Sequence, residues 1–383
     1  MKNLFPLKID LIKSHGSYVV DLNSGDEYLD MFNMYSSLPL GYNHEVFDSN
    51  EFKSEVLKVA SLRVATDVFS CDVFDKFITA FQRYTFSTNY HFNCTGALAI
   101  ESALKSAMEY KRVSSPIVIS INNSFHGVNS WGFVTSRVGV TEKRMQYYPS
   151  NSDWLQLDLD EVVTYLQNED LSNLVAVIIE PIQATNGDIY LSPETLRLVR
   201  DLCQQHDICF IIDEIQTGFG VTGKMWYYEH LNLVPDILVF GKKAQVCGIV
   251  LSDKYAGILN DKYKKLGVTF NGDLIDMIRS TYIMKAYENM GILCKVREHT
   301  EYISKNIAHK VNNYRSLGFL IAFDFDSQEK RDDYIEQCFK NKLIVNRSGD
   351  KTVRLRPNLA LTEQEMGVLI QRLSDSLGFQ SLK

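Results

Sequence analysis

The sequence predicts an α/β protein with a mostly parallel central sheet and a smaller C-terminal α+β domain. Four short runs rich in Val and Ile, at 116–120, 174–180, 208–214 and 236–240, alternate with stretches of helical pattern. Continuous apolar runs of this length are typical of strands that are buried on both faces of a parallel sheet. After residue 274 the pattern changes to a long helical stretch and then to short strands, which indicates a second domain.

The N-terminal part supplies the first elements. Residues 17–32 alternate apolar and polar side chains around an Asn-Ser-Gly-Asp turn, a pattern that predicts two short strands. Residues 97–110 have the spacing of an amphipathic helix, and we expect Leu98, Leu104 and Met108 on its apolar side.

The C-terminal part predicts helices over 274–312 and strands within 318–326, 341–348 and 351–357. A final helix begins after Thr362, which we expect to form a capping box with Glu365.

These patterns suggest three parts of the chain. We expect an N-terminal segment over 1–45, a large domain over 46–280 and a small C-terminal domain over 281–383.

Composition excludes several classes of function. The 383 residues are 45% hydrophobic and 23% charged, with a formal net charge of -7, which argues against a nucleic-acid-binding surface. No apolar run is long enough to cross a bilayer, and the N-terminus lacks the apolar core of a signal peptide, so we expect a cytoplasmic protein. The seven cysteines are scattered without a Cys-x-x-Cys pair, so we expect neither a metal site nor a disulfide framework.

Charged side chains close three successive predicted strands. Glu180 and Asp213 end two of the apolar runs, and Lys242 follows the next. Ligands of open α/β sheets bind beyond the carboxyl ends of the strands. A single charged residue at a strand end commonly marks only the point at which the chain reaches the solvent. Three such residues at successive strand ends favour a binding site.

The residue types in this group suit a pyridine cofactor bound through a lysine. A buried carboxylate such as Asp213 requires a cationic partner, and a protonated pyridine nitrogen is one. Gln216 could reach a phenolic oxygen of the same ring. Lys242 is followed by Lys243, and a neighbouring cation lowers the pKa of an amine and favours imine formation. Lys243 could equally be a solvated charge.

A phosphate site and an aromatic contact are also available. Residues 93–97, Asn-Cys-Thr-Gly-Ala, precede the predicted helix, where backbone N–H groups, a hydroxyl and a glycine suit an anion. Phe125 follows the next strand and could place its ring on the cofactor. Each signal is weak alone, because ordinary helix caps and core aromatics have the same pattern.

The motif Asp-Glu-Ile-Gln-Thr-Gly at 213–218, with Gly-Lys at 241–242, resembles the class III (ω-) aminotransferases of PLP fold type I. Within that family, residues 240–248, Phe-Gly-Lys-Lys-Ala-Gln-Val-Cys-Gly, are similar to the lysine loop of L-lysine 6-aminotransferases. Residues 28–32, 41–44 and 353–357 are similar to the same subfamily, so the resemblance covers nearly the whole chain.

The resemblance implies a site for pyridoxal 5′-phosphate (PLP). Lys242 would carry the cofactor and shuttle a proton, and Asp213 would hold the pyridinium. The remaining residues implied to contact the cofactor are Gln216 at the ring oxygen, Gly96 and Ala97 at the phosphate, and Phe125 stacked on the ring.

The resemblance also implies an assembly and a substrate contact. Thr269 matches a threonine that reaches the phosphate of the other subunit, which implies a homodimer with shared active sites. Glu180 matches an active-site glutamate, and Arg354 matches the arginine that binds a substrate carboxylate, a task suited to a guanidinium. Cys247 matches a subfamily position, to which we give a packing role.

Two departures concern the substrate side of the site. The lysine aminotransferases have an arginine after Phe-His-Gly as a second carboxylate clamp, and this chain has Val128. They also have a glutamate that pairs with the arginine matched here by Arg354. At the position of that glutamate this chain has Thr185, preceded by Ala184. Near Thr269, Asn271 and Asp273 replace the usual glycine and asparagine.

The function that we expect is transfer of a terminal amino group, as in L-lysine 6-aminotransferases, to a keto acid such as 2-oxoglutarate. One alternative is another reaction of the same fold, an aminomutase or a decarboxylase. Another is a transaminase acting on a diamine or other donor, unless a residue such as Arg137 restores the clamp. A binding module without turnover ranks last, because Lys242 and Asp213 are both present.

Overall fold

The computed structural model describes residues 4–136 and 154–378, which form two compact units. The larger unit contains residues 56–219 and 224–281, and the smaller contains residues 1–55, 220–223 and 282–383. The division into parts at residues 45 and 280 stays a prediction, because compactness does not show which parts fold independently.

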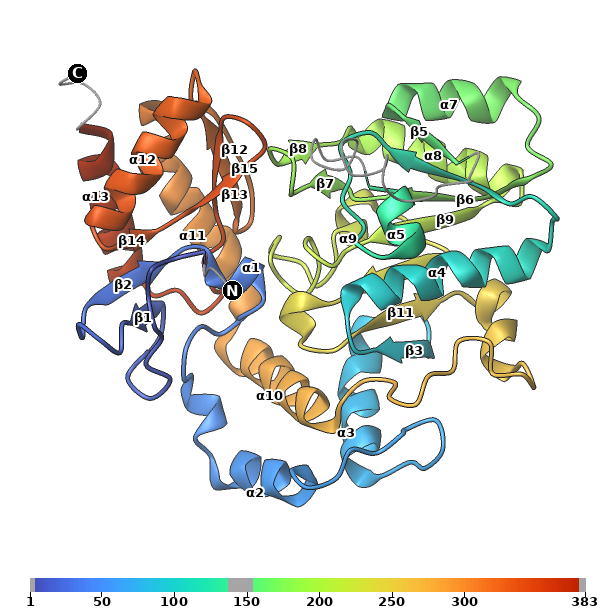
Figure 1. Ribbon diagram of the computed structural model, residues 1–383, viewed down its shortest axis with the longest axis horizontal. Helices are drawn as coiled ribbons and strands as arrows, with labels where there is room; N and C mark the ends of the chain where they lie inside the picture. The colour runs from blue at the N-terminus through green and yellow to red at the C-terminus, as the bar shows by residue number, and fades with distance from the viewer. Residues whose placement is uncertain (1–3, 137–153, 379–383) are drawn as a thin grey trace. The chain divides into compact units, whose positions relative to one another are not determined.

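The larger unit is built on a seven-stranded sheet of mixed but mostly parallel strands (Figure 1). Five consecutive strands of the sheet run parallel to one another. One strand near the edge of the sheet is antiparallel to both of its neighbours. The fold class predicted from the apolar runs is therefore confirmed. In spatial order the strands are β3 (Asn89–Asn93), the antiparallel β11 (Cys247–Leu251), β10 (Ile237–Phe240), β9 (Cys209–Asp213), β6 (Leu174–Ile179), β4 (Ile117–Ile121) and β5 (Leu155–Leu157).

Helix α4 (Gly96–Lys111) packs along one face of this sheet and contacts β3, β11, β10 and β6. The predicted helix is therefore present, but its buried face differs from the expected one. Leu104 is fully buried, whereas Leu98 is 38% exposed. The buried side is lined mainly by Ala99, Ile100, Ala103 and Ala107, because small side chains let the helix approach the strands closely.

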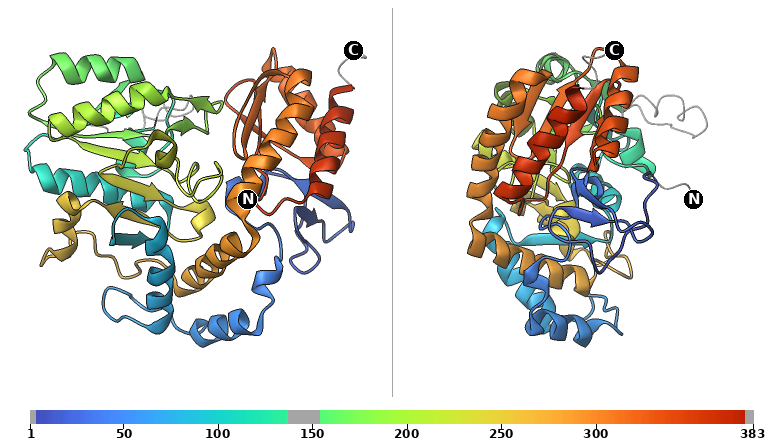
Figure 2. Two further views of the ribbon diagram at one scale, coloured as in Figure 1. Left: turned by 180° about the vertical axis from the view of Figure 1, so that it is seen from behind. Right: turned by 90° about the vertical axis from the view of Figure 1, so that its left-hand side faces the viewer.

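Further helices of the larger unit precede or connect its strands along the chain, as Figures 1 and 2 show. They are α3 (Asp72–Phe81), α5 (Ser130–Val134), α7 (Leu159–Asn168), α8 (Pro193–Gln205) and α9 (Tyr228–Leu231). Two others, α2 (Asn50–Val59) and α10 (Leu274–Met290), cross the points at which the chain passes between the units.

The smaller unit combines N-terminal and C-terminal chain. Strands β1 (Tyr18–Val20) and β2 (Glu27–Asp30) form a three-stranded sheet with β14 (Leu343–Ile344). A four-stranded sheet contains β12 (Asn312–Leu317), β13 (Leu320–Asp324), β16 (Thr352–Leu355) and β15 (Asn346–Ser348). The helices are α11 (Ile292–Ile307), α12 (Gln328–Lys340) and α13 (Glu363–Gly378).

The capping box predicted at the start of α13 is confirmed. The Glu365 amide donates to Thr362 Oγ1 at 3.2 Å, and the Thr362 amide donates to Glu365 Oε2 at 2.7 Å. Within residues 4–136 and 154–378, no helix is both long and apolar enough to span a membrane.

Candidate active site

The central sheet brings most of the predicted site residues to one edge. Strands β10, β9, β6 and β4 are neighbours and parallel, so their carboxyl ends lie side by side. Lys242, Asp213, Glu180 and Phe125 stand at or just beyond these four ends. They line a cavity of about 410 Å³ together with three other predicted residues, Gly96, Ala97 and Gln216.

Asp213 is buried at the end of β9 and is held by two hydrogen bonds. Its Oδ1 accepts the Ile215 amide at 3.0 Å, and its Oδ2 lies 2.8 Å from Nδ1 of His126. Because an ionised carboxylate only accepts hydrogen bonds, Nδ1 of His126 carries the proton in this contact. Sequence reasoning did not assign His126 a role, since its only signal was its position beside Phe125.

The other ring nitrogen of His126 is also informative. His126 is 2% exposed, and its Nε2 is buried with no hydrogen-bond partner among the described residues. The only hydrogen bond of the imidazole among the described residues is therefore the one to Asp213, while the His126 amide donates to Ser136 Oγ at 2.8 Å. His126 also lines the cavity, so the ring forms part of its wall beside the Asp213 carboxylate.

Glu180 holds the backbone on the neighbouring loop. Its Oε1 accepts the Phe125 amide at 2.7 Å, which fixes where Phe125 enters the cavity wall. Burial, and then the negative charge of Asp213, raise the pKa of Glu180 well above its ordinary value. The protonated carboxyl is thereby favoured, so the cavity carries less negative charge than two ionised carboxylates would give it.

Lys242 lies in a short turn, η3 (Lys242–Ala244), with a left-handed backbone φ of 49°. Its Nζ donates to Oε1 of Gln216. Lys243 is 1% exposed and its Nζ donates to the Gln216 backbone carbonyl at 3.3 Å, so the alternative of a solvated Lys243 is wrong. Both lysines therefore converge on Gln216.

The start of α4 forms a cradle suited to an anion. Thr95 is the N-cap, and its Oγ1 accepts the Leu98 amide at 3.3 Å. A Cβ at Gly96 would lie 2.8 Å from Cδ1 of Ile215, so only glycine fits there without displacing the cavity wall. The first N–H groups of a helix have no partner within the helix and stabilise negative charge.

The predicted substrate and interface residues lie elsewhere. Thr269 is exposed in the loop before α10 and is not among the residues that line this cavity. Arg354 is buried on β16 of the smaller unit, and Arg137 lies outside the described residues. Val128 is 66% exposed and, with Thr185, forms an uncharged part of the cavity wall.

Cys247 and Gln245 complete the lining on the lysine side. Burial raises the pKa of Cys247 to about 11, and a Cβ at Gly241 would lie 3.0 Å from its Sγ. The thiol thus packs against the backbone just before Lys242. This contact agrees with the packing role that we expected for Cys247.

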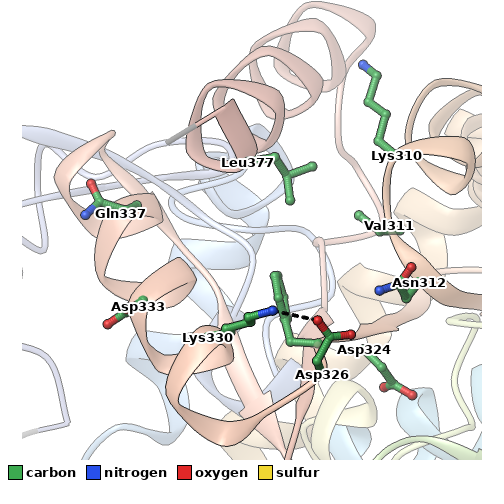
Figure 3. A pocket seen from close by; sticks show the side chains of 10 residues that line it. Lys310, Val311, Asn312, Asp324, Asp326, Lys330, Asp333, Gln337 and Leu377 are labelled. Atoms are coloured by element: carbon green, nitrogen blue, oxygen red, sulfur yellow. Dashed lines mark hydrogen bonds and ion pairs between the residues drawn. The ribbon is translucent and has the colours of Figure 1, made fainter. Parts of the chain in front are cut away.

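A second cavity, of about 560 Å³, lies in the smaller unit (Figure 3). Three of its charged side chains form ion pairs: Lys330 Nζ lies 2.7 Å from Asp326, and Asp324 accepts from Arg315 at 3.0 Å. None of the predicted site residues lines it. The smaller cavity at the sheet edge is therefore the candidate active site.

Comparisons with known proteins show the family to which the chain belongs. The family model for aminotransferase class III matches residues 2–377. L-lysine-epsilon aminotransferase from Mycobacterium tuberculosis is 30% identical over 96% of this chain and 91% of its own length. The corresponding protein from Amycolatopsis lactamdurans is 29% identical, with 97% and 92% covered. A 4-aminobutyrate aminotransferase from Schizosaccharomyces pombe is 26% identical, with 96% and 89% covered.

Solved structures of aminotransferases are also similar to this chain. The lysine aminotransferase from M. tuberculosis in its internal aldimine form superposes with a TM-score of 0.92 at 26% identity, covering 99% of this chain and 96% of the other. Ornithine aminotransferase from Toxoplasma gondii, at 22% identity and a TM-score of 0.89, shows the shared fold. The chain belongs to the class III aminotransferases, and it is a PLP-dependent transaminase of fold type I.

The described residues fit PLP on structural grounds. The cavity is lined by a buried carboxylate, a lysine and, at the start of α4, Gly96, where an added Cβ would require the Ile215 side chain to move. These are the groups that a pyridinium, an aldehyde and a phosphate require. No cluster of His, Cys, Asp or Glu in the described ranges 4–136 and 154–378 is arranged to hold a metal ion.

Glu214 anchors the chain directly after Asp213. It is 1% exposed, and its two carboxyl oxygens accept the amides of Tyr227 and Tyr228 at 2.5 and 2.9 Å. Burial raises the pKa of Glu214 to about 8, although these two backbone hydrogen bonds lower it in part. Glu214 therefore joins the carboxyl end of β9 to the start of α9.

This pKa gives a test by the pH dependence of stability. Because the pKa of Glu214 is higher in the folded state than its ordinary 4.5, its stabilising protonation is complete below pH 4.5 and is lost as pH rises through 8. We expect the free energy of unfolding to fall over this window with a slope of at most about 1.4 kcal/mol per pH unit from this group. Urea unfolding of Glu214→Gln should give a flatter profile between these limits.

Glu161→Gln is the matched control, because Glu161 also accepts a backbone amide, that of Asp158 at 2.8 Å, but from an exposed position on α7. If the free energy of unfolding depends on pH with the same slope in the wild type and in Glu214→Gln, folding does not raise the pKa of Glu214.

Proposed function

We propose that this transaminase moves a terminal amino group from an L-lysine-like donor to a keto acid such as 2-oxoglutarate. The observation that carries the proposal is the placement of Lys242 and Asp213 in one cavity at the ends of adjacent strands. The relatives named L-lysine-epsilon aminotransferase support the donor class.

The roles that we propose follow from chemistry and position. When bound, PLP supplies an aldehyde that accepts amines and a ring that withdraws electrons. Lys242 would hold the cofactor covalently and move a proton, and Asp213 would keep the pyridine nitrogen protonated. Gln216 would contact the ring oxygen, and Phe125 would stack on the ring. Glu180 would act by holding the backbone of Phe125 and limiting the negative charge beside Asp213.

The proposed anchoring groups for phosphate and substrate come from two places. The backbone of Gly96 and Ala97 at the start of α4 would bind the phosphate. Arg354 would bind a substrate carboxylate through its guanidinium.

The cofactor assignment has a direct chemical test. We expect the purified protein to be yellow and borohydride to fix the cofactor on Lys242, as peptide mass spectrometry would show. Lys242→Ala should retain weak cofactor binding but lose at least about a thousandfold in turnover, because a covalent step and a proton transfer both depend on this amine. Lys243→Met serves as the control. Attachment at Lys243, or at no lysine, would refute the assignment.

We further propose a homodimer with shared active sites, because Thr269 is exposed and lies outside the cavity of its own chain. A threonine hydroxyl from a second copy would then contact the phosphate bound at the start of α4. Closed two-fold dimers are the commonest assemblies of enzymes and place such a loop opposite its counterpart.

Complementation tests the shared site. Thr269→Asp would put a negative charge beside the phosphate, and Lys242→Ala removes the lysine, so each homodimer should be inactive. When the two variants are mixed and refolded, we expect about one quarter of the wild-type activity, because random pairing gives half of the dimers one intact site. Absence of any recovery, together with an active monomer fraction on gel filtration, would contradict the proposal.

The cavity wall argues for a weak grip on the donor's α-carboxylate. Val128 and Thr185 line the wall without charge, where the relatives resembled by the sequence have a guanidinium and a carboxylate. Losing a charge-assisted bidentate contact weakens carboxylate binding by about 1.5–3 kcal/mol. A donor without the α-carboxylate, such as a diamine, would then compete well with L-lysine.

The substrate proposal is tested by kcat/KM for L-lysine, L-ornithine and cadaverine. Val128→Arg should raise the preference for L-lysine over cadaverine by about ten- to a hundredfold, because it supplies the missing guanidinium. Val128→Met, which changes volume without adding charge, should leave the ratio nearly unchanged. A wild-type preference for L-lysine of about a thousandfold, or about 4 kcal/mol, would instead mean that another residue already clamps the carboxylate.

A further inference from the structure

The turn that presents Lys242 has an unfavourable backbone conformation. Lys242 and Gln245, at its two ends, have left-handed φ angles of 49° and 60°. Residues with a Cβ are disfavoured there, so a conformation of this kind persists only when surrounding contacts hold it. The turn belongs to the hairpin between β10 and β11, in which Phe240 pairs with Gly248. The strands fix its ends but not its middle.

Gln245 supplies the contacts that hold this turn. Its backbone amide donates to the Lys242 carbonyl at 2.8 Å, and its side-chain Nε2 donates to the same carbonyl at 3.3 Å. The Lys242 carbonyl is therefore held by two N–H groups of one residue. Gln245 also lines the cavity, so this contact lies at the site and not behind it.

A second layer orients the Gln245 amide. Its Oε1 accepts from Nη1 of Arg279 at 3.3 Å, and the same Nη1 lies 2.6 Å from Asp276 on α10. Arginine only donates hydrogen bonds and a backbone carbonyl only accepts them, so each fixes one end of the amide. With Oε1 directed at Arg279, Nε2 can only face the Lys242 carbonyl.

We propose that Gln245 is a positioning residue for Lys242: it keeps the lysine turn left-handed, so that Nζ points into the cavity toward Gln216. Arg279 acts through Gln245 by setting the direction of its amide. The inference rests on the proposed attachment of the cofactor to Lys242. Without the hydrogen bond from the Gln245 side chain to the Lys242 carbonyl, the backbone of residue 242 returns to ordinary φ values, and its side chain leaves the cavity for part of the time.

The test measures covalent attachment of the cofactor directly. PLP is removed from the purified protein and added back, and the covalent bond is followed by its absorbance and by borohydride trapping on Lys242. In Gln245→Met, which keeps the length of the side chain but removes both polar groups, the covalently held fraction relative to the non-covalent fraction should fall about two- to tenfold, as expected for one hydrogen bond.

Arg279→Met completes a double-mutant cycle. It should have a smaller effect, because Nε2 remains, and the double variant should be no worse than Gln245→Met alone, since Arg279 acts through Gln245. Gln156→Met is the matched control: Gln156 Nε2 also donates to a carbonyl, that of Val134 at 3.0 Å, but away from the lysine turn. It should leave attachment unchanged.

A last comparison separates positioning from direct contact with the cofactor. In a Lys242→Ala background, adding Gln245→Met should leave the dissociation constant of PLP unchanged. Weaker PLP binding in that background would overturn the inference, as would unchanged attachment in Gln245→Met. Trapping on Lys242 in the wild type tests the cofactor assignment separately, so a failure of Gln245 alone leaves that assignment intact.

Discussion

The buried carboxylate of Asp213 is the constraint on which the rest of the site depends. A carboxylate in this position, 4% exposed at the end of a fully apolar strand, is costly unless hydrogen bonds and positive charge stabilise it. The Ile215 amide and His126 each provide a hydrogen bond, and a bond to a charged group contributes about 1.5–3 kcal/mol. The Ile215 amide comes from the turn that follows β9, whereas His126 is brought close because the parallel strands β4 and β9 end on the same side of the sheet.

The carboxyl group of Glu180, beside that of Asp213, limits how much negative charge this side of the sheet can carry. Glu180 ends the strand next to that of Asp213, and two adjacent negative charges would repel each other in a poorly solvated cavity. The raised pKa of Glu180 reduces this repulsion, because it favours the neutral form of the second carboxyl group. The site can then favour a single positive centre near Asp213, while Glu180 serves the backbone of Phe125.

The features that could be predicted from the sequence are those that depend on residues close together along the chain. The four Val- and Ile-rich runs predicted the central strands, and strand order then placed Glu180, Asp213 and Lys242 together, because parallel neighbours share an edge. The contact of His126 was missed because its partner Asp213 lies 87 residues away along the chain, and the orientation of the Gln245 amide depends in part on Arg279, 34 residues away. The burial of Lys243 could not be predicted either, since its partner is a backbone carbonyl with no sequence signature.

The cavity has a floor and a rim of different origin, and this difference explains how its chemistry and its specificity can be separated. The floor is made by strand ends and by the start of α4, where a change such as a Cβ at Gly96 collides with Ile215. The rim is made by loops, where Val128 is exposed and Thr185 is exposed as well, so their side chains can change without disturbing the sheet. Under the proposed function, substitution at the rim would alter which donor is held while Asp213 and Lys242 stay in place. A chain could then keep groups that suit the cofactor at the floor and still change its substrate contacts at the rim, because the two parts of the wall come from different elements.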